Sequence, residues 1–110
     1  MPYVIKMFQF EDKPIHAVII DGKYMFSARD VAVALGYSDP SRAYHTNCKS
    51  LRLFSCDKSS DINWVNEIQQ FEYLIDESDV NKLIVNKQHV VFNEWFIKVL
   101  KFIKNEFNTQ

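Results

Sequence analysis

The sequence contains little glycine, proline or cysteine, and each shortage excludes a class of protein. Two glycines in 110 residues are too few for a P-loop or a dinucleotide-binding fingerprint, because both need repeated glycines close to a phosphate. Three prolines leave little material for a proline-rich linker. The two cysteines, Cys48 and Cys56, are not flanked by histidines at zinc-ligand spacing, so we expect no metal and no other cofactor.

Long apolar runs are also missing. No stretch approaches the length needed to cross a bilayer, and the first residues lack the basic and apolar blocks of a secretory signal. We therefore expect a cytoplasmic protein, or a nuclear one if its host is eukaryotic, with no membrane partner.

Net charge is nearly absent, since thirteen Lys and Arg oppose fourteen Asp and Glu. This balance excludes a strongly basic coat over the whole chain, but it leaves room for a local basic face. Residues 41–60 contain Arg42, Lys49, Arg52 and Lys58 against one acidic residue. Residues 61–80 contain no basic residue and six acidic ones: Asp61, Glu67, Glu72, Asp76, Glu77 and Asp79.

What the sequence does contain is sufficient for one globular domain over residues 1–110. Hydrophobic residues make up 47% and aromatic residues 15%, which allows a large core for this length. The apolar patterns predict an α+β fold. Its expected order is three N-terminal antiparallel strands, a helix-turn-helix-like helix pair, a β-hairpin wing and two C-terminal helices.

The strands are expected within residues 3–26. Asp21-Gly22 separates two apolar runs, and such a pair is a strong hairpin signal because both turn positions favour a positive φ. An earlier turn is expected over residues 11–14. The wing is expected between residues 51 and 75.

Two short helices follow the strands. Ser27 with Asp30 fits a capping box, and Gly36 is suited to ending the first helix. Asp39 is a favourable N-cap with Pro40 at the first helical position, so a second helix is expected to about residue 48. The spacing is that of a helix-turn-helix.

The C-terminal third predicts two further helices. Ser78 is expected to cap the first of them, and the second is expected over residues 90–104. Phe92, Trp95 and Val99 belong to an apolar stripe that we expect in the core, part of which is also a candidate dimer seam. Lys98, Lys101 and Lys104 are expected on a solvated side.

Two stretches resemble the N-terminal domain of the BRO family, which occurs in baculovirus repeated-ORF proteins and prophage antirepressors. The first covers residues 21–43, from Asp21-Gly22 through Ala34-Leu35-Gly36-Tyr37 to Pro40-Ser41. The second includes Glu77-Ser78, Leu83-Ile84, Trp95 and Ile103. The resemblance spans about residues 3–104, and it implies a small DNA-binding domain of viral or prophage origin that regulates genes.

The candidate DNA-binding residues follow from the second helix and the wing. They are Ser41, Arg42, His45, Thr46 and Lys49, with Arg52 and Lys58 on the wing. A simpler interpretation of the residues on the second helix is that they form an ordinary solvent-exposed face with no ligand. Double-stranded DNA is the expected partner, and a palindromic site would favour a homodimer.

A second hypothesis is a protein antagonist that binds a repressor or another host or phage protein without touching DNA. The acidic stretch from Asp61 to Asp79 favours it, because such a stretch could meet a basic partner. Metal binding by Asp76, Glu77 and Asp79, as in a nuclease, is a weaker third hypothesis, since helix capping explains these acids. No nucleophile has a base nearby in the sequence, so we expect no enzymatic activity.

Overall fold

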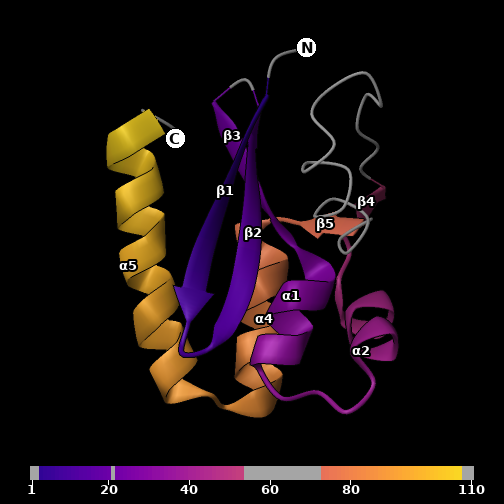
Figure 1. The fold of residues 1–110 in the computed structure, drawn as a ribbon. Coiled ribbons are helices and arrows are strands. Elements are labelled where there is room, and N and C mark those ends of the chain that lie inside the picture. The colour runs from indigo at the N-terminus through magenta and orange to yellow at the C-terminus, as the bar shows by residue number, and fades with distance from the viewer. Residues whose placement is uncertain (1–2, 21, 54–72, 108–110) are drawn as a thin grey trace.

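The computed structural model describes residues 3–20, 22–53 and 73–107, which form an α+β fold with helices packed on a twisted sheet (Figure 1). The strands are β1 (Tyr3–Phe10), β2 (Lys13–Ile20), β3 (Lys23–Ser27), β4 (Arg52–Leu53) and β5 (Tyr73–Ile75). The described helices are α1 (Ala28–Ala34), α2 (Pro40–Asn47), α4 (Glu77–Lys87) and α5 (Val90–Phe107). The predicted fold class is confirmed.

The three N-terminal strands form consecutive antiparallel hairpins. Ile20 pairs with Lys23, so the connection between β2 and β3 has the two residues that the Asp-Gly signal predicts. The earlier turn is shorter than expected, because Phe10 pairs with Lys13 and leaves only two residues between the strands. Pro14 therefore lies inside β2, opposite Gln9, at a position before β2 begins to pair with β3.

The strand pair expected as a wing extends the main sheet. β4 pairs with β5 in antiparallel fashion, and β5 pairs with β3, which gives the sheet order β1-β2-β3-β5-β4. Backbone hydrogen bonding to β3 thus draws the hairpin into the sheet edge beside α2 (Figure 1). The residues between β4 and β5, 54–72, lie outside the described part of the chain.

The core lies between the sheet and the helices packed on it, and the long C-terminal helix contributes two large rings to it. Phe10 meets Phe92 edge-on at 4.9 Å between ring centroids, and Phe26 meets Phe96 at 5.1 Å. All four rings are buried. Such edge-to-face contacts add roughly 0.5–1.5 kcal/mol per pair to the burial itself.

Of two predicted helix starts, the one at Ser27 is confirmed without its capping box, and the one at Ser78 needs correction. Ser27 caps α1 by accepting from the Asp30 amide at 3.1 Å, but the Asp30 carboxylate does not complete a capping box. It binds the backbone N–H and Nδ1 of His16 instead, at 3.0 and 2.7 Å. The N-cap of α4 is Asp76, which accepts from the Asp79 amide, and Ser78 lies exposed inside the first turn.

Candidate nucleic-acid interface

Helix α2 presents four of the predicted residues along its outward side. Ala43 and Tyr44 are buried against the rest of the protein, and the intervening positions of a 3.6-residue turn point the other way. The exposed residues on that side are Ser41, Arg42, His45 and Thr46. The structure thus brings these four together on one short helix at the edge of the molecule (Figure 1).

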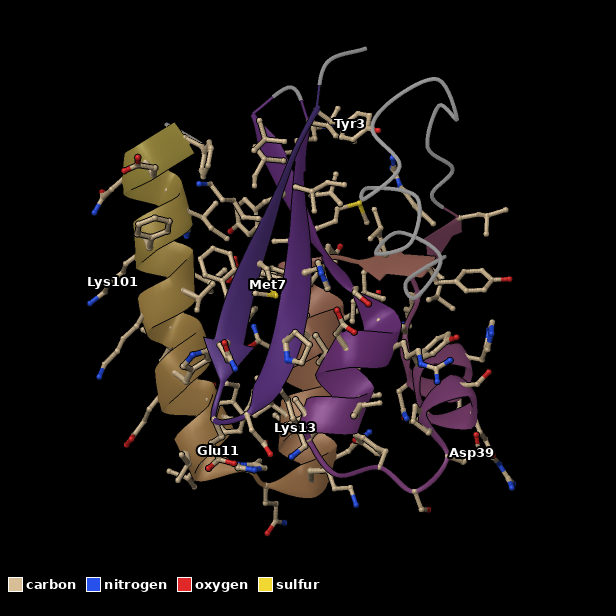
Figure 2. The ribbon with its side chains drawn as sticks, in the orientation of Figure 1. Tyr3, Met7, Glu11, Lys13, Asp39 and Lys101 are labelled. Carbon is tan, nitrogen blue, oxygen red and sulfur yellow. The ribbon has the colours of Figure 1, made fainter. Side chains whose placement is uncertain are left out.

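The start of α2 is fixed as the sequence predicts. The Asp39 side chain accepts from the Arg42 amide at 3.2 Å, and Pro40 occupies the first helical position. Figure 2 shows Asp39 at the outer edge of the molecule, beside the exposed turn of the helix. A well-capped short helix is the kind of rigid support that a recognition surface requires.

His45 is held in place by two aromatic rings. It lies 4.7 Å from the Tyr44 ring and 5.0 Å from the Tyr73 ring, between centroids. Tyr73 comes from β5 and is only partly buried, so it borders the outward side of α2. Sequence reasoning did not identify Tyr73 as part of this surface, because its contact with His45 depends on sheet pairing between distant segments.

The end of α2 is anchored by a buried carboxylate. Asp79 of α4, 1% exposed, accepts from the Lys49 amide at 3.1 Å and from the Ser50 amide at 2.7 Å. Lys82 lies 3.5 Å from the same carboxylate. This anchor fixes the backbone at Lys49, whose own side chain is exposed, and no local motif signalled it.

Cys48 marks the buried end of the same helix. Burial, together with the negative charge of Asp79, raises the pKa of its thiol to about 12. A thiol that is buried and fully protonated at neutral pH is a packing residue and a poor nucleophile.

The two residues predicted on the wing have different outcomes. Arg52 lies in β4, exposed at the sheet edge, opposite Leu74 of β5. Lys58 lies outside the described residues. The described part of the candidate interface therefore consists of the outward side of α2 followed by Lys49 and Arg52.

The acidic residues around the start of α4 have structural partners. Asp76 caps the helix, Asp79 binds the backbone after α2, and Glu77 accepts a hydrogen bond from the hydroxyl of Tyr24. Within residues 3–20, 22–53 and 73–107, no group of three or more His, Cys, Asp or Glu side chains is placed to hold a metal ion. The described geometry therefore does not bring these acids together as ligands.

The lysines of α5 lie on the other side of the molecule from α2 (Figure 1). Lys98, Lys101 and Lys104 are all exposed, and Lys101 points away from the sheet (Figure 2). The solvated face expected from their spacing is thus what the structure contains. They cannot extend the surface of α2.

The apolar stripe of α5 packs against the rest of the same chain. Phe92 and Val99 are buried, and the indole N–H of Trp95 donates to the backbone carbonyl of Gln9 at 3.0 Å. This stripe therefore offers little surface to a dimer, and a homodimer stays a prediction. Among the described helices, none is both long and apolar enough to cross a membrane.

Comparison with known proteins agrees with the sequence resemblance. No curated protein and no solved structure matches this chain. The family model described as "BRO family, N-terminal domain" matches residues 14–101, which include β3, β4, β5, α1, α2 and α4, nearly all of β2 and most of α5, but not β1. Because this match covers most of the sequence, the chain belongs to the BRO family and contains its N-terminal domain.

Proposed function

We propose that this protein is a viral or prophage regulatory domain that binds double-stranded DNA through the outward side of α2. Membership of the BRO family supports a regulatory domain of viral or prophage origin. The observation that carries the DNA-binding role is the placement of Arg42, His45 and Thr46 on the exposed side of a capped and anchored helix.

The chemistry of this surface suits DNA. Arginine pairs with guanine edges in the major groove, whereas lysine, threonine and serine serve mostly as contacts to phosphates. Lys49 and Arg52 lie just beyond α2, where they would reach the backbone that borders the groove. Three basic side chains, Arg42, Lys49 and Arg52, are available to neutralise phosphates. The slope of log affinity against log salt concentration should therefore be near −3 at most, since each neutralised phosphate contributes about −0.9.

Fluorescence anisotropy of a labelled duplex at two salt concentrations tests this function. Arg42→Ala/Lys49→Ala should reduce affinity at least tenfold, because two contacts are lost, and should reduce the salt slope by about one for each of the two side chains that neutralises a phosphate. The matched control is Lys98→Ala/Lys101→Ala, which removes the same charge from the far side of the molecule. Equal affinities of the two double variants would refute the role of α2.

A protein antagonist is the second candidate, and the acidic stretch is the observation that favours it. Its described part supports this candidate weakly, because Asp79 is buried and Asp76 and Glu77 have partners within the chain. Absence of duplex binding even at low salt, together with recovery of one defined protein partner, would favour the antagonist over the DNA-binding domain.

A further inference from the structure

A groove lies between the end of α2 and the exposed side of α4. Its volume is about 360 Å³, and it is lined by Asn47, Ser78, Asn81, Lys82, Val85 and Asn86. None of these side chains is acidic, and five of the six carry polar groups. The groove is open to solvent along α4.

We infer that this groove holds the sugar–phosphate backbone of the DNA strand that borders α2. The inference rests on the proposed function and extends it, because it assigns α4 a direct role in holding the duplex. It adds a second binding element that is separated from α2 by some thirty residues of sequence.

The lining residues have the chemistry that a phosphodiester requires. Serine, asparagine and lysine are among the side chains that donate to phosphate oxygens in protein–DNA complexes. Lys82 is 40% exposed, so its ammonium group can approach a ligand while it remains near Asp79. The carboxylate of Asp79 is itself 1% exposed and faces two backbone amides, so it presents little negative charge to the groove.

The spacing along α4 also suits an extended strand. Ser78, Asn81, Lys82 and Val85 recur at three- and four-residue intervals and form one helix face. From the first to the last, this face is about 10 Å long at 1.5 Å per residue. Successive phosphates of one strand advance about 3.4 Å along the duplex axis, so a face parallel to that axis would span about three such steps.

The groove is rigidly connected to α2. The side-chain amide of Asn86 donates to the side-chain oxygen of Asn47 at 2.9 Å, and the side-chain amide of Asn47 donates to the Ala43 carbonyl at 2.8 Å. Lys49, immediately beyond, is bound through its backbone to Asp79, the residue that also contacts Lys82. A strand lying in the groove would therefore pass beside the C-terminal end of α2, next to Lys49.

The test places two negative charges in the groove. Ser78→Asp/Asn81→Asp substitutes two exposed positions, and an aspartate near the start of α4 is favourable to the helix dipole. The matched control is Gln9→Glu/Asn105→Asp, which adds the same charge at exposed positions on β1 and α5. Duplex anisotropy at low salt is measured for both, with thermal denaturation to verify that both remain folded.

We expect the groove variant to lose at least tenfold in duplex affinity and the control to lose less than twofold. Equal losses would overturn the inference, and would leave the groove to a ligand such as a peptide. The proposed function fails separately, if Arg42→Ala/Lys49→Ala binds DNA as well as its own control does. Loss of binding in the α2 variant with none in the groove variant would refute only the groove.

Discussion

Replacement of Asp79 by asparagine would test whether the end of α2 depends on one buried carboxylate. The native side chain accepts from two backbone amides, at 3.1 and 2.7 Å, and is almost fully buried. Asparagine has the same shape but only one oxygen, so its amide nitrogen would face the N–H of Lys49 or Ser50. One hydrogen bond to a charged group would be lost and one buried donor left unsatisfied.

The expected cost of this substitution is about 2–4 kcal/mol, which is less than the sum of its two contributions because they overlap at one site. Hydrogen bonds to charged groups contribute about 1.5–3 kcal/mol, and an unsatisfied buried donor costs about 1–3 kcal/mol. The free energy of unfolding of a small domain is only about 5–15 kcal/mol. For a domain of this size, each kcal/mol lost lowers the melting temperature by roughly 4 °C. Asp79→Asn should therefore lower the melting temperature by about 10 °C.

Urea and thermal denaturation provide the measurement, and Lys82→Met provides the control. The ammonium of Lys82 lies 3.5 Å from the Asp79 carboxylate and is 40% exposed, so its loss should cost less than about 1 kcal/mol. A loss below about 1 kcal/mol in Asp79→Asn would refute the reasoning. So would an equal loss in both variants, since the ion pair and not the backbone anchor would then be the main contribution.

Three smaller effects follow from the same structure. Ser27→Ala should lower the free energy of unfolding by about 1 kcal/mol in urea, because it removes the buried cap of α1; an unchanged midpoint would contradict this. The pKa of the Cys48 thiol is about 12 in the folded protein, compared with 9.0 for an ordinary thiol. In a Cys56→Ser variant, which leaves Cys48 as the remaining cysteine, the thiolate fraction near pH 8 should therefore be roughly a thousandfold lower in the folded than in the unfolded chain. Its labelling by a thiol reagent should therefore be slow until urea unfolds the protein, and stability should fall as pH rises above 9, because only the unfolded chain then ionises. Burial and the hydrogen bond to Glu77 raise the pKa of Tyr24, so Tyr24→Phe should remove a phenolate transition above the ordinary tyrosine range from an absorbance titration, and an unaltered titration would argue against the contact.

Local rules allowed much of the fold to be predicted. The Asp-Gly hairpin, the cap at Ser27, the left-handed Gly36 and the cap at Asp39 all occur as expected. Each depends on hydrogen bonds or steric limits within about four residues, so the neighbouring sequence contains the necessary information. The exposed side of α2 could be found for the same reason.

Carboxylates were harder to interpret, because several partners compete for them. Asp30 has the spacing of a capping box, yet it binds His16, fourteen residues earlier in the chain. Ser78 is a favourable N-cap by type, yet Asp76 caps α4 because the chain leaves β5 directly before it. Asp79 binds amides thirty residues away. Side chains with strong acceptors follow whichever donors the fold places near them.

The sequence by itself determined the helices and hairpins, the family of the chain and the basic residues of α2, because periodicity, turn chemistry and ordered motifs are local properties. Only the tertiary structure decided that the supposed wing joins the main sheet, that Tyr73 packs against His45 and that Asp79 anchors the end of α2. It also formed the groove between Asn47 and α4. These features require contacts between segments far apart in the chain, and such contacts depend on how the whole core packs.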